Sequence, residues 1–243
     1  MSGVAVVTGG IAGIGRAVSL ALGDRGFDVA VLDPGPDDEH VVSSLTSSGR
    51  KALHLPIDVS HEADVEAAAA TISAELGDPV VLVNNAGVFP RFAALEGSYS
   101  EWMDVVRINL GGAFLCSRTF APGMLRGGQG AIVNLSSGRA LAGAPRGSHY
   151  AASKGGIIAL TRSLALEWAP TIRVNTVIPG LTDTSQPRVD MSEDDLQEAA
   201  RAIPLGRIGQ PRDAAELVCF LVSSSADYIT GQSYAVNGGA ILQ

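Results

Sequence analysis

The chain has 243 residues, of which 46% are hydrophobic and 17% charged, a composition typical of a globular protein. Its net charge of −8 argues against nucleic acid or an anionic membrane as a partner, because both bind basic faces. No apolar run reaches the length of a membrane span.

Short β-branched runs alternate with helical patterns along the chain. The predicted strands are Val4–Val7, Asp28–Leu32, Ala52–Ile57, Val80–Val83, Ala131–Leu135, Arg173–Val177 and Ser233–Val236. The predicted helices are Ile14–Arg25, His61–Leu76, Tyr99–Arg126, Tyr150–Trp168, Glu193–Ala202 and Asp213–Ser223. Apolar strands between helices predict a doubly wound α/β fold, in which helices cover both faces of a parallel sheet.

No internal repeat or low-complexity linker interrupts this alternation, so we expect residues 1–243 to form a single domain. The polar stretch 181–202, which contains Pro187, is expected to be a lid over a binding site.

The two cysteines, Cys116 and Cys219, lie in apolar helical stretches outside any CxxC pair. We expect buried, reduced thiols, no metal ion and a cytoplasmic location. Residues Met1–Thr8 lack a basic segment, and no signal peptide is expected.

A glycine-rich turn, Thr8-Gly9-Gly10-Ile11-Ala12-Gly13-Ile14-Gly15, joins the first predicted strand to the first helix. Glycines at such a turn let the backbone approach a pyrophosphate, and the helix N-terminus supplies free N–H groups to that anion. A plain structural turn is the alternative reading, which the strand–loop–helix context disfavours.

Asp33 ends the second predicted strand, 18 residues after Gly15. A carboxylate at this place accepts hydrogen bonds from the adenosine ribose hydroxyls and repels a 2′-phosphate. Ala12 and Pro34 offer no compensating cation, so the sequence favours NAD over NADP as cofactor.

Tyr150 and Lys154 stand at i and i+4 of a predicted helix and project from one face. An ammonium about 4 Å from a phenol, at an effective dielectric of 20, stabilises the phenolate by roughly 4 kcal/mol, or about three pKa units. We therefore expect Lys154 to bring the pKa of Tyr150 to about 7, where proton transfer in either direction is efficient.

These motifs, with Asn84-Asn85-Ala86-Gly87, Ser136-Ser137 and Pro179-Gly180, follow one another in an order and spacing that resemble the classical short-chain dehydrogenase/reductase family. The resemblance spans Thr8 to Gly239 and implies a Rossmann-type dinucleotide-binding and catalytic domain. The catalytic residues it implies are Tyr150 as acid and base, Lys154, Ser137 to polarise the substrate oxygen, and Asn109 as proton relay. Ser137, 13 residues before Tyr150, is preferred to Ser136, which is expected to face the core.

The resemblance also implies a set of cofactor contacts. They are Thr8, Gly9, Gly13, Ile14 and Gly15 at the turn; Asp33; Asp58 and Val59 at the adenine; Asn85, Ala86 and Gly87 at the ribose; Tyr150 and Lys154; and Pro179, Gly180, Thr182 and Thr184 at the nicotinamide. Asn237 stands where the family usually has Asp, a departure with no evident chemical consequence.

The expected reaction moves a hydride between NAD(H) and a secondary alcohol or carbonyl compound, such as a sugar, a polyol or an anionic hydroxy compound. Arg91, Arg139, His149 and Arg188 fall in segments expected to border the substrate. Arginine suits carboxylate and phosphate groups; solvated or subunit-bridging arginines, and a His149 that points away, are the alternatives.

Two other functions stay open: a 3-oxoacyl or other carbonyl reductase, for which NADPH would be expected, and a non-catalytic nucleotide-binding relative. The family resemblance further implies that helices Tyr99–Arg126 and Tyr150–Trp168 pair between subunits of a homotetramer, with Gly111, Gly112, Ala151 and Gly155 at close-packing positions. A dimer is the alternative.

Overall fold

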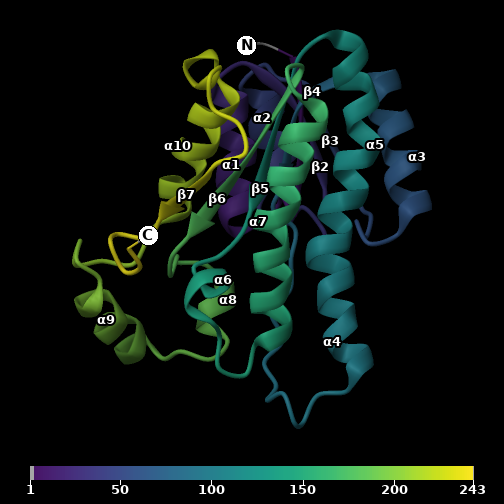
Figure 1. Cartoon of the computed structure of the whole chain (residues 1–243). Helices are drawn as coiled ribbons and strands as arrows, with labels where there is room; N and C mark the ends of the chain where they lie inside the picture. Colours follow the sequence, from purple (N-terminus) through teal and green to yellow (C-terminus); the bar gives the residue numbers. More distant parts are fainter. Residues whose placement is uncertain (1–2, 243) are drawn as a thin grey trace.

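The computed structural model describes residues 3–242 and contains one sheet of seven parallel strands (Figure 1). The strand order is β3-β2-β1-β4-β5-β6-β7. The strands are β1 Gly3–Thr8, β2 Phe27–Leu32, β3 Ala52–Leu55, β4 Pro79–Asn84, β5 Gly130–Leu135, β6 Ile172–Pro179 and β7 Ser233–Val236. The predicted doubly wound α/β fold is confirmed, and the strand order reverses between β1 and β4.

Helices cover both faces of the sheet. The long helices are α1 Gly13–Asp24, α3 Glu62–Glu75, α4 Tyr99–Val106, α5 Gly112–Gly127, α7 Ser148–Trp168, α9 Glu193–Ala202 and α10 Pro211–Val222. Shorter ones are α2 Val41–Ser47, α6 Arg139–Ala142 and α8 Ser185–Arg188, with a π-helical turn at Arg107–Gly111 and a 3₁₀ turn at Ser224–Ala226. In Figure 1, α4, α5 and α7 lie on one face and α1, α2 and α10 on the other.

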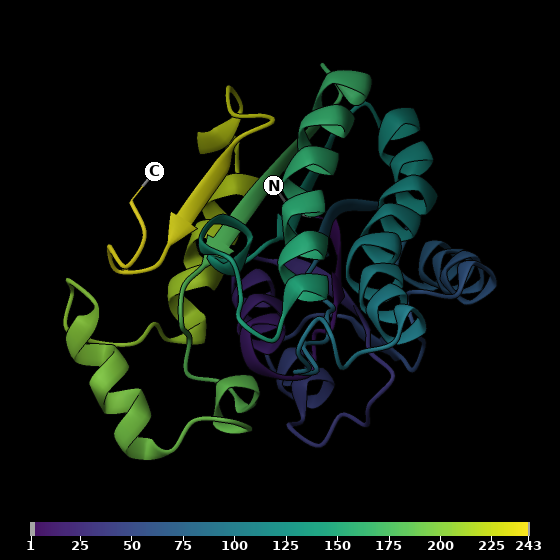
Figure 2. The ribbon, with the colours of Figure 1, turned by 60° about the horizontal axis from the view of Figure 1, so that its bottom comes forward.

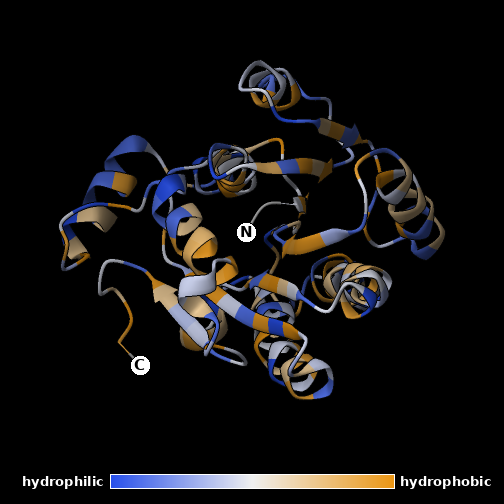
Figure 3. Cartoon of the chain, turned by 90° about the horizontal axis from the view of Figure 1, so that it is seen from above, coloured by the Kyte–Doolittle hydropathy of each residue, from blue (hydrophilic) through white to orange (hydrophobic). Residues whose placement is uncertain are grey.

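The strands are hydrophobic along their whole length because both of their faces are buried. In β1, Ala5 and Val7 enter the core beneath α1 and α10, while Val4 and Val6 enter the core on the opposite face. Figure 3 shows the hydrophobic colouring running through the central strands, between the helices. Cys116 and Cys219 are both buried as free thiols, as expected.

A line of buried polar side chains crosses the middle of the sheet and fixes α7 against it. Asn84 donates to Asn134 Oδ1 at 2.8 Å, and Asn134 donates to Thr161 Oγ1 at 2.9 Å. Thr161 lies on α7 and also accepts from Thr176 of β6 at 2.7 Å. Since buried polar groups are costly when unpaired, these bonds determine how α7, which carries Tyr150, sits on the strands.

The predicted helix Tyr99–Arg126 is interrupted, because α4 passes into α5 through the π-helical turn at Arg107–Gly111. Helices α2, α6 and α8 were not predicted from the sequence. Each has at most seven residues, too few turns to display a helical repeat of apolar residues.

The carboxyl ends of the strands meet at one edge of the sheet, where α6, α8 and α9 gather (Figure 2). In residues 3–242, no helix has the combined length and apolarity needed to cross a bilayer.

Candidate active site

A cavity of about 450 Å³ lies at the carboxyl edge of the sheet. It extends from the glycine-rich turn and Asp33, past Asn85–Gly87, to Ser137, Tyr150 and Lys154. In open parallel sheets a ligand binds at this edge, next to the reversal of the strand order. The structure therefore brings the candidate nucleotide residues and the candidate catalytic residues into one continuous space.

The glycine-rich turn is shaped by contacts that leave no room for side chains. A Cβ at Gly15 would lie 1.9 Å from the carbonyl oxygen of Gly9, a clash that no movement of a side chain can relieve. Gly9 has a φ of +63°, in the left-handed region that favours glycine. The backbone itself thus forms the floor of this end of the cavity.

The N-terminus of α1 opens onto the cavity with its backbone donors free of side-chain caps. Its N-cap residue is Ala12, whose side chain makes no capping bond, and its first turn has no acidic residue. The first N–H groups of a helix lack intrahelical acceptors and attract anions. This end of α1 is therefore suited to a diphosphate group.

Thr8 and Asn85 lock the two loops that border this space. Thr8 Oγ1 accepts the N–H groups of Asn85 and Ala86, both at 3.0 Å. Asn85 Nδ2 donates in return to the carbonyls of Thr8 and Gly9, at 3.0 and 2.9 Å. The ends of β1 and β4 consequently behave as one rigid unit.

The catalytic candidates converge from α7 and β5. Tyr150 and Lys154 lie in the first two turns of α7, and the Ser137 hydroxyl lies close enough to the Tyr150 phenol to lower its pKa. Ser137 Oγ also accepts the N–H of Arg139 at 3.2 Å, so its proton is left for another acceptor. Ser136 faces the core as expected and donates to the carbonyl of Lys154 at 2.7 Å.

Lys154 and Asn109 meet beneath Gly87. A Cβ on Gly87 would be 3.2 Å from Asn109 Oδ1 and 3.4 Å from Lys154 Nζ. Asn109, on the π-helical turn, accepts the N–H of Val88 at 2.8 Å and donates to the Val88 carbonyl at 3.0 Å. Asn109 thus holds the Gly87–Val88 segment in place and lies just behind the cavity wall.

Burial governs the proton affinities at this site. It raises the pKa of Tyr150, while the hydrogen bond with Ser137 and the charge of Arg139 act in the opposite direction. Burial lowers the pKa of Lys154 to about 8. The expected lowering of the Tyr150 pKa to about 7 runs against this direction, because burial has the largest effect on the phenol. Lys154 Nζ donates to the Leu135 carbonyl at 2.8 Å.

Comparison with known proteins identifies the family. The family described as "Enoyl-(Acyl carrier protein) reductase" matches residues 10–240. The 3-oxoacyl-(acyl-carrier-protein) reductase FabG of Staphylococcus aureus is 40% identical over all of this chain and 99% of its own length. The cis-4-hydroxycyclohexanecarboxylate dehydrogenase of Sinomonas cyclohexanicum is 39% identical over 97% of this chain and 95% of its own.

A solved structure, described as short-chain dehydrogenase/reductase SDR:glucose/ribitol dehydrogenase from Brucella melitensis, superposes with a TM-score of 0.90 at 30% identity. It covers 99% of this chain and 97% of its own. The chain belongs to the short-chain dehydrogenase/reductase family. It is an oxidoreductase, and this family uses a nicotinamide cofactor.

In this short-chain dehydrogenase/reductase, most of the residues predicted for the site line the cavity. They are Gly9, Gly13, Ile14, Asp33, Asn85, Ala86, Gly87, Ser137, Tyr150, Lys154, Pro179, Gly180, Thr182 and Thr184. Thr8, Gly15 and Asn109 lie behind the wall and shape it. Asp58 and Val59 do not line the cavity: Asp58 binds the N–H of Ser60 at 2.9 Å, and Val59 packs in the core.

The four predicted substrate residues separate into two groups. Arg91 and Arg139 line the cavity, whereas Arg188 and His149 do not. Arg188 is exposed and paired with Asp183 at 2.8 Å and Glu193 at 3.0 Å. His149 is fully buried, and its Nε2 donates to the Pro90 carbonyl at 2.7 Å.

Sequence reasoning missed the contribution of the C-terminal segment. Asn237, Ala240 and Ile241 line the cavity, as does Met191 of the segment 181–202. Asn237 donates to the Ile241 carbonyl at 2.8 Å and accepts the N–H of Gly239 at 2.9 Å. Asn237 therefore shapes the turn that brings Ile241 to the cavity, an arrangement that no local sequence signal indicates.

The buried Lys154 makes a testable difference to stability. A fall in pKa from 10.5 to about 8 corresponds to roughly 3 kcal/mol. Below pH 8 Lys154 is charged in both the folded and the unfolded chain, so folding includes the full free-energy cost of burying the ammonium. Between pH 8 and 10.5 the folded chain alone is neutral, and the cost fades as the pH rises. We predict that Lys154→Met raises the free energy of unfolding at pH 7 by roughly 2 to 3 kcal/mol, and by little near pH 10.

Urea unfolding at pH 7, 8.5 and 10 measures this. Lys51→Met is the matched control, since Lys51 is exposed and is the only other lysine in the sequence. An equal change at all three pH values would contradict the prediction.

Proposed function

We propose that the protein transfers a hydride between NAD(H) and a secondary alcohol or its ketone. The observation that carries this proposal is the single cavity that joins the uncapped end of α1 and Asp33 to Ser137, Tyr150 and Lys154. In this proposal the chain is one catalytic domain of a cytoplasmic enzyme. Residues 181–202 form a lid over the substrate.

The residues at the nucleotide end fit NAD. The N-terminus of α1 would hold the diphosphate, Asp33 the adenosine ribose, and the Pro179–Thr184 segment the carboxamide of the nicotinamide. When bound, the nicotinamide accepts or supplies the hydride. Arg16, the cation nearest along the chain to the glycine-rich turn, is paired with Glu39 at 2.8 Å; this supports NAD rather than its 2′-phosphorylated form.

At the catalytic end, Ser137 and Tyr150 would both hydrogen-bond to the reacting oxygen. During oxidation Tyr150 takes the hydroxyl proton as a phenolate, and during reduction it returns the proton as a phenol. Lys154 holds the ribose next to the nicotinamide and receives the proton beneath Gly87. Asn109 completes the relay through a water molecule at this point.

A second candidate is the reduction of a 3-oxoacyl thioester. It is favoured by the 40% identity to the FabG proteins over the whole chain. The acidic Asp33 end of the cavity counts against NADPH as the reductant for this reaction. The catalytic roles of Ser137, Tyr150 and Lys154 would be the same.

For the substrate, a hydroxy acid is the class that we favour. The relative from Sinomonas cyclohexanicum acts, by its name, on a secondary alcohol that carries a carboxylate. In this chain Arg139 follows Ser137 closely, lines the cavity and has no carboxylate within 4.0 Å in the described residues. Arg91 also lines the cavity but is paired with Asp190. Arg139 is thus the cation best suited to receive a substrate anion.

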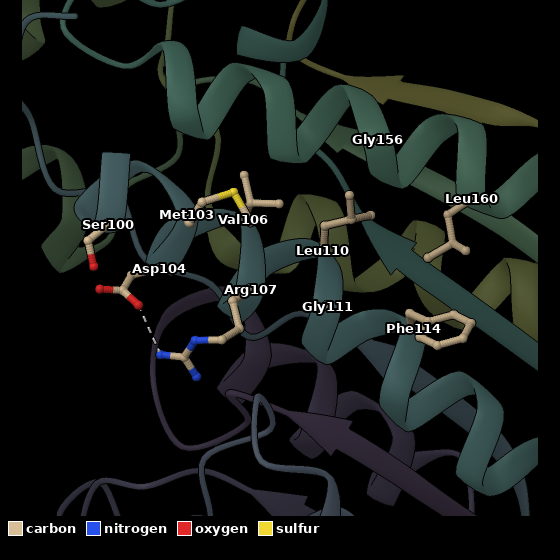
Figure 4. Close-up of a pocket in the computed structure, with 10 residues that line it drawn as sticks. All are labelled: Ser100, Met103, Asp104, Val106, Arg107, Leu110, Gly111, Phe114, Gly156 and Leu160. Atoms are coloured by element: carbon tan, nitrogen blue, oxygen red, sulfur yellow. Dashed lines mark hydrogen bonds and ion pairs between the residues drawn. The ribbon is translucent and has the colours of Figure 1, made fainter. Parts of the chain in front are cut away.

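We also propose a homotetramer. An open groove of about 600 Å³ runs along α4, the π-helical turn and α5, and Leu110, Phe114 and Leu160 lie in it (Figure 4). Gly155 has open space at the Cβ position, and a Cβ on Gly111 would make only an ordinary contact with the Val106 carbonyl at 3.9 Å, which suits close packing of a second copy. Gly112 instead packs within the chain against Val59.

The cofactor preference is the first test of this function. We predict that the ratio of kcat/KM for NAD over NADP exceeds tenfold, and that Asp33→Ala reduces it, because the carboxylate no longer repels a 2′-phosphate. The assay follows nicotinamide absorbance with polyols, aldoses and hydroxy acids, and with acetoacetyl-CoA and either reduced cofactor. Asp38→Ala, at an exposed acid of the same loop, is the control. Equal use of both cofactors, or activity with acetoacetyl-CoA and NADPH alone, would favour the second candidate.

The substrate anion provides a second test. We predict that Arg139→Gln lowers kcat/KM for cis-4-hydroxycyclohexanecarboxylate about tenfold or more, because a charge-assisted contact is lost. The neutral 4-hydroxycyclohexanecarboxamide should lose clearly less, because only the effect of Arg139 on the pKa of Tyr150 remains for it. Arg188→Gln is the control, since two carboxylates already neutralise that cation. If all variants treat both substrates as the parent does, the substrate is neutral.

Assembly is tested by light scattering at micromolar concentration. We predict a particle of four 24.9 kDa chains, and its dissociation by Phe114→Glu, which places a charge in the groove. Leu95→Glu, at a fully exposed loop position, should leave the assembly intact. A monomeric parent would rule out the proposed assembly.

A further inference from the structure

The segment Phe89–Phe92 leaves β4, passes the mouth of the cavity and stacks on the first turn of α7. Two consecutive residues of α7 each contact one ring of this segment. His149 stacks on Phe92 with ring centres 4.1 Å apart and planes inclined by 13°. Tyr150 stacks on Phe89 at 4.1 Å and 15°. The catalytic tyrosine is therefore part of a double stack between the loop and the helix.

His149 is held by one hydrogen bond as well as by its stack. Its Nε2 lies 2.7 Å from the Pro90 carbonyl oxygen; because a carbonyl only accepts, this nitrogen carries the proton. Its Nδ1 is buried and has no hydrogen-bond partner within residues 3–242. A buried acceptor without a partner costs about 1–3 kcal/mol, a cost that a phenyl ring of similar shape would avoid. Burying this histidine therefore costs stability, and the hydrogen bond to the Pro90 carbonyl is the contact that a phenyl ring at this position could not make.

The backbone around α7 is adapted to the same contact. A Cβ at Gly147 would lie 2.6 Å from Phe89 Cε2, so a larger residue would push Phe89 away from Tyr150. The N–H of Phe92 donates to the Arg146 carbonyl at 3.1 Å. Residues 146–150 therefore hold the segment through its backbone and through both of its rings.

Phe89 also contacts a charge. The Arg91 guanidinium lies 4.7 Å from the centre of the Phe89 ring, within the range of a cation–π contact. Arg91 is also paired with Asp190 of the segment 181–202. Phe89 consequently contacts both Tyr150 and Arg91, and it lines the cavity together with them.

We propose that His149 is a positioning residue for proton transfer: by holding Pro90 and Phe92, it keeps Phe89 packed on the ring of Tyr150 and so fixes the phenol against the substrate. The proposal rests on the proposed function, in which Tyr150 exchanges the proton. His149 does not contact the cavity; its effect reaches Tyr150 through Phe89. Displacement of a catalytic group by about 1 Å can cost a hundredfold in rate, so loosening of this wall should lower kcat measurably.

Two variants separate the hydrogen bond from the stack. His149→Phe keeps an aromatic ring on Phe92 but cannot donate to Pro90, whereas His149→Gln keeps a donor and loses the ring. We expect His149→Phe to lower kcat about tenfold with an unchanged dissociation constant for NAD, and His149→Gln to recover most of that loss. His61→Phe, at an exposed histidine, is the matched control and should behave as the parent.

A double-mutant cycle with Phe89→Leu tests whether His149 acts through Phe89. If it does, His149→Phe adds little to the loss caused by Phe89→Leu. Full additivity, a parental kcat in His149→Phe, or an equal loss in His149→Gln would each overturn the proposal.

Amide hydrogen exchange distinguishes failure of this proposal from failure of the proposed function. In His149→Phe, exchange at Phe92 should accelerate without any cofactor or substrate, because the bond from its N–H to Arg146 is less protected. Unchanged exchange would overturn the proposal even in an active enzyme. If exchange at Phe92 is faster in His149→Phe but the parent protein does not reduce NAD with any substrate, the contact between the loop and α7 is supported and the proposed function is rejected.

Discussion

The constraint on which the rest of the structure depends is the junction between β1 and β4, where the strand order reverses. The connections that follow these two strands run to opposite sides of the sheet, and a crevice is left between them. The Thr8 hydroxyl closes the base of this crevice by accepting two N–H groups of the β4 loop. This fixes the floor of the cavity beside the glycine-rich turn and the start of the Gly87–Val88 segment, which Asn109 then holds.

Burial then sets the chemistry at the other end. It disfavours both the phenolate of Tyr150 and the ammonium of Lys154, so the proton affinities of the two groups shift in opposite directions. Ser137 and Arg139 oppose the shift of Tyr150. Arg139 therefore favours the phenolate, and in the proposed function it also receives the substrate anion. The acid–base strength of the site is a balance between desolvation and these two neighbours.

Ion pairing decides which arginines are available. The protein is acidic, and carboxylates pair with three arginines from segments expected to border the cavity: Arg91, Arg146 and Arg188. A paired guanidinium gains less from a second anion, because its charge is already compensated. The sequence places Arg91, Arg139 and Arg188 near the substrate but does not distinguish them. The carboxylates that pair with Arg91 and Arg188 are Asp190, Asp183 and Glu193, and their positions relative to the cavity depend on the fold.

The sequence by itself determined the parallel sheet and predicted the glycine-rich turn and the Tyr150–Lys154 pair, because each is encoded locally. Ser137 and Asn109 were implied by the family resemblance alone. A few neighbouring residues are enough to recognise each of these patterns: the apolar strands, the glycines of residues 9–15, and the i, i+4 spacing of Tyr150 and Lys154. Only the tertiary structure decided what depends on distant segments. The stack of His149 on Phe92 joins residues 57 positions apart, and the packing of Ile241 beside the cavity joins segments still more distant in sequence. The burial that lowers the pKa of Lys154 arises from the whole fold. No short-range pattern records such contacts, because long-range packing is fixed by the complete set of neighbouring side chains.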